Sequence, residues 1–445
     1  MNTPHRRPGL NSARIWLLLT GVATLALCFV IGSSPISAQD NSELQVGPTI
    51  RVAVPQALPS VPTVAVHGDR VWVAWGEYDE TTEMAFAYIA SSEDGGQTFS
   101  APQQFGTGGT EYPNIAATDD GTLFLSHLEW AEEPLIDDYY LAWLVLHRSV
   151  DGGQTWELVG QTPDSAATFS QPYEPELAVS ADGSRVLLTW LDATPAQYLP
   201  PDALTAVEGT MSTPVWVSFS ADGGQTFSTP STVIESSCSC CRSKPFFIGE
   251  TPAIAYRDLE SVDDTHDERD MYVITMADDG TWQAPVEVHN DGFTLDLQGC
   301  PTSGPGADAQ DGAVQVAWWT GAQDRAGYWL ATGSADTFGT PISLPDTNQH
   351  FSSLDLEIAP SGDSFVLASD VASPGETAAG AIGHMLRVFH VSGDVAQEVE
   401  TATANDLAPQ YGETYDIAAS DTGVVIVWLA ESAEGQTIMF RRIDQ

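Results

Sequence analysis

The chain has 445 residues, with 61 acidic and 15 basic side chains, and its formal net charge at neutral pH is −46. A surface this acidic repels the phosphates of nucleic acids and the headgroups of anionic membranes, which excludes a nucleic-acid-binding function. The length is sufficient for one large domain with its own core.

The first 38 residues predict export from the cytoplasm. Three arginines precede an apolar run, Ile15–Ile31, and a short polar segment follows it. This order is typical of a signal peptide or of an uncleaved membrane anchor. We expect cleavage after Ala38, a linker over residues 39–48 and one folded domain over residues 49–445. The predicted location is then secreted, periplasmic or attached to the cell surface.

Seven short runs of β-branched and aromatic residues recur along the rest of the chain, and each is bounded by Gly, Asp or Pro. They are Val71–Trp75, Leu123–Leu128, Val186–Trp190, Ala253–Tyr256, Val314–Trp319, Ser364–Ala368 and Val424–Trp428. We interpret each run as the second strand of a four-stranded unit. The last unit has no fourth strand, whereas Thr49–Val54 is a strand left over at the other end. Pairing the two closes the ring, so we predict an all-β propeller of seven blades, with six blades as the alternative.

A repeated phrase separates the later strands of the first three units. It reads SEDGGQTF at Ser92–Phe99, SVDGGQTW at Ser149–Trp156 and SADGGQTF at Ser220–Phe227. The Asp side chain can accept hydrogen bonds from nearby backbone N–H groups, and the paired glycines supply positive φ angles. The phrase therefore predicts a tight turn that ends a β-hairpin.

The phrase Ser-x-Asp-x-Gly-x-Thr-Phe/Trp is the Asp-box, and the chain resembles the bacterial sialidase-like propellers with BNR repeats. The resemblance implies that Asp94, Asp151 and Asp222 hold structural turns far from an active site. If the protein is an enzyme, the resemblance implies a glycoside hydrolase of the exo-α-sialidase type. The Arg-Ile-Pro element of catalytic sialidases has its nearest counterpart around Arg51, where the spacing differs.

Blade topology assigns the loops to two faces. Because strands alternate in direction, the turns with the repeated phrase share one face, and the loops between second and third strands share the other. The longest loops fall on this second face, around the mouth of the channel. Functional residues are expected there, since loops on a rigid scaffold commonly carry them.

Four cysteines remain once the leader, with Cys28, is set aside. Cys238, Cys240 and Cys241 form a CSCC motif, and Cys300 lies in a GCP motif. CxCC and GCP pairs also resemble a subgroup of exported sialidase-like propellers, which implies a shared structural role. In an exported protein, we expect disulfides, with one bridge from Cys300 to the CSCC loop. The alternative is a thiolate site for copper or zinc, completed by His289 or His266.

Cationic side chains are scarce, and several gather between residues 242 and 325. We predict that Arg242, Arg257 and Arg325 form a patch that binds a carboxylate or sulfate, provided that Ala253–Asp258 is the second strand of its blade. If that segment is the inner strand instead, Arg257 lies on the opposite face. Alternatively, these arginines serve only as partners in ion pairs.

Three inner strands open with Glu and Tyr close together, which places these side chains around the channel mouth. Glu413 and Tyr415 are candidates for the Tyr–carboxylate pair of a sialidase, and Glu111 and Glu174 are candidates for an acid. Alternatively, these residues belong only to the pattern with which each unit starts.

We therefore predict a propeller that recognises a carbohydrate or another small anionic ligand on the long-loop face, without ordinary sialidase catalysis. One alternative is a glycoside hydrolase that acts on an anionic glycan. Another is an exported metal-binding protein that uses the cysteine loop. We expect a monomer, and no cofactor apart from copper or zinc if that loop holds a metal.

Overall fold

The computed structural model describes residues 44–106, 108–131, 140, 142–162, 172–192, 212–263, 266–289, 294–295, 301, 303–322, 325–345, 353–371, 384–399, 414–432 and 435–445. The chain from Glu43 to Gln445 forms one compact unit. Its described residues form strands and turns. Within the described ranges, no helix is long and apolar enough to cross a membrane.

The first three antiparallel sheets follow one another along the chain. The first contains β3 (Leu58–Pro59), β4 (Thr63–His67), β5 (Arg70–Asp79), β6 (Met84–Ser92) and β7 (Gln103–Phe105). The second contains β8 (Thr110–Ala117), β9 (Leu123–Trp130), β10 (Ala142–Ser149) and β11 (Glu157–Thr162). The third contains β12 (Pro172–Val179), β13 (Val186–Asp192), β14 (Ser212–Ser220) and β15 (Ser231–Cys238).

The next three sheets repeat this order, and the fourth carries an inserted hairpin. The fourth contains β16 (Lys244–Ile248), β17 (Thr251–Arg257), β20 (Met271–Thr275) and β21 (Val286–Glu287), and its hairpin consists of β18 (Glu260–Asp263) and β19 (His266–Glu268). The fifth contains β22 (Gly306–Gln310), β23 (Ala313–Thr320), β24 (Gly327–Gly333) and β25 (Ile342–Ser343). The sixth contains β26 (Leu354–Ile358), β27 (Ser364–Val371), β28 (His384–Ser392) and β29 (Val395–Val399).

The seventh sheet joins the two ends of the unit. It contains β30 (Tyr415–Ser420), β31 (Gly423–Ser432) and β32 (Gly435–Asp444), together with β1 (Gln45–Val46) and β2 (Ile50–Ala53). Both early strands pair antiparallel with β32, and Ile50 lies opposite Phe440. The predicted closure by an N-terminal strand is therefore confirmed.

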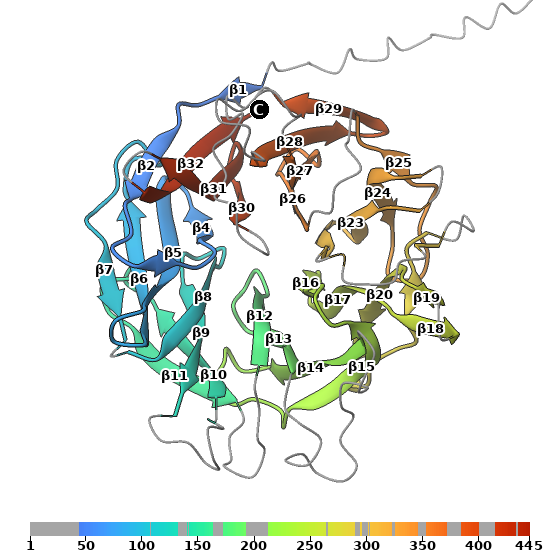
Figure 1. The fold of residues 1–445 in the computed structure, drawn as a ribbon, viewed down its shortest axis with the longest axis horizontal. Helices are drawn as coiled ribbons and strands as arrows, with labels where there is room; N and C mark the ends of the chain where they lie inside the picture. Colours follow the sequence, from blue (N-terminus) through green and yellow to red (C-terminus); the bar gives the residue numbers. More distant parts are fainter. Residues whose placement is uncertain are drawn as a thin grey trace, which may run out of the picture. The chain divides into compact units, whose positions relative to one another are not determined.

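The seven sheets stand around a central axis as the blades of a propeller (Figure 1), and the region around this axis, between the inner strands, is called the channel below. The inner strands β4, β8, β12, β16, β22, β26 and β30 contact one another in this order, and β30 contacts β4. Seven blades are thus confirmed, and the six-blade alternative is wrong. All seven predicted runs are second strands, which places Ala253–Tyr256 in β17 rather than in an inner strand.

The apolar core lies between neighbouring blades. Second strands supply its largest members, among them Trp75, Trp190 and Trp428, which are almost fully buried. Trp428 of the last blade packs in one cluster with Leu367 and Val388 of the blade before it. Second strands are buried on both faces because a blade lies on either side, and this explains their nearly continuous apolar sequences.

The repeated phrases form tight turns between third and fourth strands. In the first, the Asp94 carboxylate accepts hydrogen bonds from the Thr98 backbone N–H at 2.8 Å and the Thr98 hydroxyl at 2.6 Å, while the Gly96 N–H donates to Ser92 Oγ at 2.9 Å. Gly96 has a φ of 86°, and a Cβ there would lie 2.0 Å from the Phe440 ring. Asp151 and Asp222 make the same contacts in the next two blades. These three aspartates therefore stabilise the backbone of the turns in which they lie.

Candidate ligand-binding site at the channel mouth

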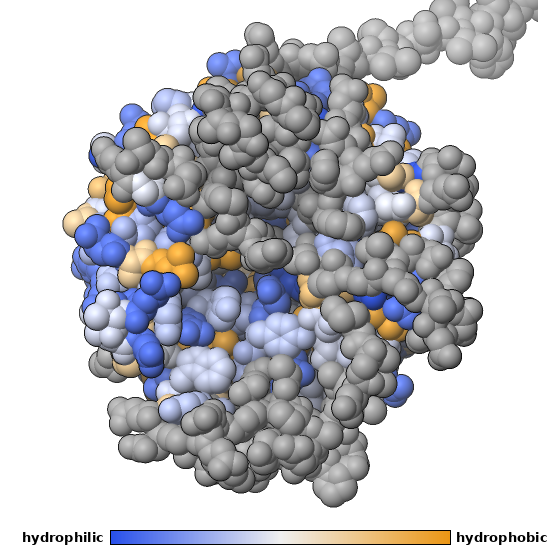
Figure 2. Space-filling model, in the orientation of Figure 1, coloured by the Kyte–Doolittle hydropathy of each residue, from blue (hydrophilic) through white to orange (hydrophobic). Residues whose placement is uncertain are grey.

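A cavity of about 370 Å³ opens where several inner strands begin. Its wall comes from the segment before β4, the end of β5 and the starts of β8, β12 and β30, with Arg242 from the segment before β16. The space-filling view along the channel shows mostly hydrophilic side chains around the central hollow (Figure 2). The charged and aromatic members of the wall are Glu77, Tyr78, Glu111, Tyr112, Glu174, Glu176, Arg242, Tyr415 and Asp416.

Two neighbouring inner strands carry the same irregularity at this wall. The pairing of β8 with β9 slips between Glu111 and Asn114, and the pairing of β12 with β13 slips between Tyr173 and Glu176. Inside each bulge the residue before a proline is left-handed: Tyr112 has a φ of 50° and Glu174 a φ of 48°. Such a conformation is costly outside glycine, and bulges commonly redirect side chains. Here the redirected residues line the cavity.

Two carboxyl groups in the cavity hold their protons more tightly than usual. Burial raises the pKa of Glu111, although its carboxyl accepts a hydrogen bond from Trp130 Nε1 at 3.1 Å. Desolvation also raises the pKa of Glu174, against the opposing effect of Arg242. Glu111 is partly buried and Glu174 is exposed to solvent at the cavity, so the surrounding wall desolvates both carboxyl groups only in part. Partial desolvation by the wall, with the charges of Glu111 and Glu174, likewise raises the pKa of Tyr112, although 41% of this residue is exposed.

Arg242 is the cation of this wall, and carboxylates already neutralise it. Its Nη1 lies 2.8 Å from Glu176 Oε1, and its Nη2 lies 3.7 Å from Asp355 Oδ2. The side chain is only 9% exposed. Its guanidinium is therefore a fixed part of the wall.

Below the mouth, acidic side chains of the inner strands line the channel. The Lys244 ammonium donates to Asp355 Oδ1 at 2.7 Å. The Asp416 carboxyl accepts a hydrogen bond from the Val64 backbone N–H at 2.7 Å, and the Asp308 carboxyl accepts one from the Ile358 backbone N–H at 2.9 Å. Each of these carboxyl groups therefore links its own blade to a neighbouring one. Desolvation raises the pKa values of Asp308, Glu357 and Asp416. In contrast, Lys244 and Arg242 outweigh desolvation at Asp355 and lower its pKa.

The predicted catalytic residues take different positions. Glu111 and Glu174 line the cavity, as does Tyr415. However, Tyr415 is almost fully buried, and its hydroxyl donates to the Ser353 carbonyl and accepts the Ser369 backbone N–H at 3.1 Å. This hydroxyl thus binds the neighbouring blade. Glu413, its predicted partner, lies outside the described residues, so their pairing stays a prediction.

The structure does not bring the three predicted ligand-binding arginines together at the cavity. Only Arg242 lines it. Arg257 is 1% exposed and donates to the backbone carbonyls of Ser303, Arg269 and Trp319. Arg325 lies over the Trp329 ring, 4.8 Å from its centroid. We therefore leave Arg257 and Arg325 out of the candidate site, because their surroundings fix them elsewhere.

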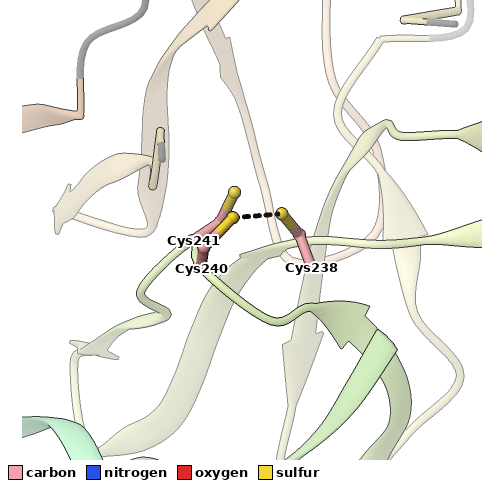
Figure 3. A group of neighbouring side chains, drawn as sticks. All are labelled: Cys238, Cys240 and Cys241. Carbon is pink, nitrogen blue, oxygen red and sulfur yellow. Dashed lines mark hydrogen bonds between the residues drawn. The ribbon is translucent and has the colours of Figure 1, made fainter. Parts of the chain in front are cut away.

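The CSCC motif starts at Cys238, the last residue of β15, and its sulfur atoms converge (Figure 3). Those of Cys238, Cys240 and Cys241 all lie within 4.8 Å of one another. Cys238 and Cys241 are buried free thiols, whereas Cys240 takes part in a disulfide whose other cysteine is outside the described residues. Cys300 is also outside them, so its pairing with this loop stays a prediction.

The pKa values of the two free thiols shift in opposite directions. A hydrogen bond from Cys241 and the nearby guanidiniums of Arg257 and Arg269 lower the pKa of Cys238 to about 6, against burial. Burial raises the pKa of Cys241 well above its usual range. His289, a predicted metal ligand, stacks instead on Trp318 with ring centroids 5.2 Å apart. The side chain of His266, the other predicted ligand, is not described.

The sequence did not indicate several of the residues that form the wall and the channel. Tyr112 carried a usable signal, since Tyr112-Pro113 and Glu174-Pro175 occupy matching places in successive units. Lys244 carried another, because it is the only lysine of the chain. The partners Glu176 and Asp355 had none, since contacts between distant inner strands leave no local pattern.

Comparisons with known proteins complete this description. No protein-family model matches the chain, and no curated protein matches it. Among solved structures it is similar to a protein of unknown function from Dyadobacter fermentans (TM-score 0.48, 12% identity, 90% of this chain and 99% of that one). It is also similar to an α-L-arabinanase of Penicillium chrysogenum (0.47, 15%, 73% and 93%) and to a sialidase of Trypanosoma rangeli (0.43, 11%, 89% and 60%). None of these TM-scores reaches 0.5, so we derive the function from the site itself.

Proposed function

We propose that this propeller binds a carbohydrate in the channel-mouth cavity without sialidase-type catalysis, and that the bound sugar is neutral or cationic. The observation that carries the proposal is the wall itself, in which exposed tyrosines stand beside carboxyl groups. Tyr78 and Tyr112 are 38% and 41% exposed and line the cavity. Aromatic faces pack against the C–H faces of a sugar ring, while carboxyl groups accept hydrogen bonds from its hydroxyls.

The charge of the wall favours neutral and cationic sugars over anionic ones. Recognition of a sugar carboxylate calls for guanidinium groups with free donors. Arg242 is the sole cation that lines the cavity among the described residues, and it already faces Glu176 and Asp355. An anionic sugar would also meet Glu111 and Glu174. We therefore replace the anionic ligand of the initial hypothesis with a neutral or amino sugar.

Isothermal titration of the purified domain with neutral, amino and acidic oligosaccharides tests this proposal. We expect heat from the first two classes and none from the acidic class. Tyr112→Ala should weaken binding about tenfold or more, which corresponds to ~1.4 kcal/mol. Leu158→Gln is the matched control, because Leu158 is an exposed residue of β11 away from the cavity wall. Binding confined to acidic glycans, or unaffected by Tyr112→Ala, would contradict the proposal.

A glycoside hydrolase is the second candidate, and one observation favours it. Glu111 and Glu174, with raised pKa values, share the cavity with Glu176, which Arg242 neutralises. A carboxyl group with a raised pKa beside a second carboxyl group that is paired with a guanidinium is the combination that glycoside hydrolysis uses. A panel of fluorogenic glycosides provides the assay. Turnover that is lost in Glu174→Gln would establish this candidate. If no glycoside of the panel is hydrolysed while sugar binding is intact, only the recognition function is supported.

We also propose that residues 1–38 direct export and that the mature protein is a monomer. The leader pattern of basic, apolar and polar segments supports the first part. Intact mass and N-terminal sequencing of protein from the membrane and extracellular fractions would separate a cleaved signal peptide from a retained anchor. Light scattering of the same material would measure the oligomeric state.

A further inference from the structure

The turn between β15 and β16 presents a feature that carbohydrate binding does not explain. Cys238 and Cys241 are both 0% exposed, and both are free thiols. Their sulfur atoms lie within 4.8 Å of each other. Buried, adjacent thiols are unusual in a chain with an export leader, because oxidising compartments convert such pairs into disulfides.

The loop holds the two thiols in place from the backbone and from a side chain. The Cys241 backbone N–H donates to the Cys238 carbonyl at 3.0 Å, which closes the turn. Arg269, itself 0% exposed, donates from Nη1 to Cys238 Sγ at 3.2 Å. A guanidinium that donates to sulfur stabilises the thiolate, the form in which cysteine binds metals.

We propose that Cys238 and Cys241 bind one copper(I) ion between their sulfur atoms. Soft thiolates favour copper(I), and both ligands are already side by side in the turn (Figure 3). Cys240 Sγ lies 3.7 Å from Cys238 Sγ, but it belongs to a disulfide and is not counted as a ligand. Binding forms two Cu–S bonds, and each thiol that is still protonated releases its proton to solvent. No electron is transferred, so copper must arrive as copper(I).

The charge of the surroundings selects a monovalent ion over zinc. Two thiolates with copper(I) carry one negative charge, and two thiolates with Zn²⁺ carry none. Arg257 is buried close to this loop, and its donors go to three backbone carbonyls, which leave its positive charge in place. Arg269 has a further ion pair with Asp267 at 3.6 Å. Asp270 lies near Arg257 and offsets part of its charge. An anionic copper–thiolate group adds to this stabilisation of the buried guanidinium, whereas a neutral zinc–thiolate group adds none.

Anaerobic titration of the full mature protein with copper(I), against a chromophoric copper(I) chelator, tests the proposal. We expect one retained ion per chain, and zinc in tenfold excess should not displace it. Cys238→Ser and Cys241→Ser should each abolish retention. Ser239→Ala, in the same turn, is the matched control and should retain the ion. Arg269→Gln should weaken retention about ten- to hundredfold, as changes next to metal ligands commonly do.

X-ray absorption of the copper-loaded wild-type protein provides a measurement that needs no variant to fold. Two sulfur neighbours around copper are expected. Nitrogen or oxygen neighbours, loss of all copper to the chelator, equal retention of zinc, or retention by both folded serine variants would each overturn the proposal.

Discussion

Two sets of carboxyl groups in this propeller behave in opposite ways. Asp94 and Asp151 lie in the turns between third and fourth strands, here called the rim, and both are partly exposed. Hydrogen bonds from Thr98 and Thr155 lower their pKa values to about 2. Glu357 and Asp416, inside the channel, have raised pKa values because burial disfavours their charged forms. The difference shows that the balance between burial and neighbouring hydrogen-bond donors, rather than residue type, sets the direction in which the pKa of a carboxyl group shifts in this fold.

The largest expected effect comes from breaking the buried pair in the channel. Lys244→Met leaves Asp355, which is 0% exposed, with Arg242 as its remaining cation at 3.7 Å. We expect a loss of about 3–5 kcal/mol in the free energy of unfolding, as is usual when one partner of a buried pair is removed. Urea denaturation measures it, and the double variant Lys244→Met/Asp355→Asn should recover part of the loss. A loss below about 1 kcal/mol would show that the channel pair is not a buried charge pair in this sense.

The second effect is a pH dependence of the free energy of unfolding, which has an acid limb and an alkaline limb of opposite slope. The raised pKa values in the channel contribute stability that is complete below the ordinary carboxyl pKa of about 4 and is lost as pH rises through the raised values. The lowered pKa values on the rim contribute stability that is present above about 4 and is lost as pH falls towards about 2. Unfolding free energy measured across pH should therefore fall on both sides.

Glu357→Gln separates the two limbs, because it removes a titrating group from the channel and leaves the rim turns intact. We expect this variant to lose less stability than the wild type as pH rises from about 5 to about 8, while its acid limb stays unchanged. Identical alkaline limbs in the two proteins would rule out Glu357 as a source of the pH dependence.

A smaller effect is expected from a rim turn. Ser92→Ala removes the hydroxyl that donates to Asp94 at 2.7 Å and accepts the Gly96 N–H at 2.9 Å. Since a buried N–H then lacks its acceptor, we expect a loss of about 1–2 kcal/mol by thermal or urea unfolding. Ser91→Ala, on the neighbouring and partly exposed position, is the control and should change stability much less. Equal losses in both variants would contradict a specific role for the Ser92 hydroxyl.

The smallest effect is expected from an ion pair on the rim surface. Arg70 Nε lies 2.9 Å from Glu93 Oε2, but the two side chains are 46% and 66% exposed. Solvent screens such pairs, so Arg70→Gln should cost no more than about 0.5–1 kcal/mol, and less at high salt. A salt-independent loss as large as that of Lys244→Met would contradict the contrast between rim and channel.

The sequence predicted the fold well because its signals were local. The run from Val71 to Trp75 shows a strand in five residues, and the phrase from Ser92 to Phe99 shows a turn in eight. The matching phrases in the next blades fixed the order of strands. The left-over strand at Thr49–Val54 then required the closure that β2 and β32 make.

The site was less predictable because its contacts are distant in the chain. Glu111 and Glu174 line the cavity as expected, since each opens an inner strand. Lys244 and Asp355, however, are 111 residues apart, and nothing at either position indicates the other. The sequence predicted that Arg257 binds a ligand, whereas the packing of β17 buries it among backbone carbonyls. Burial of a charged side chain depends on the assembled ring, which local patterns do not encode.

The position of Lys244 gives the folded protein an unusual chemical property. It is the only lysine in the chain, its side chain is 15% exposed, and the ammonium is bound to Asp355. Amine-selective acylating reagents therefore find the α-amino group and almost no other target while the blades stay together. Acylation of Lys244, read by mass spectrometry, counts the molecules whose channel has opened, so the native sequence carries its own reporter of blade separation.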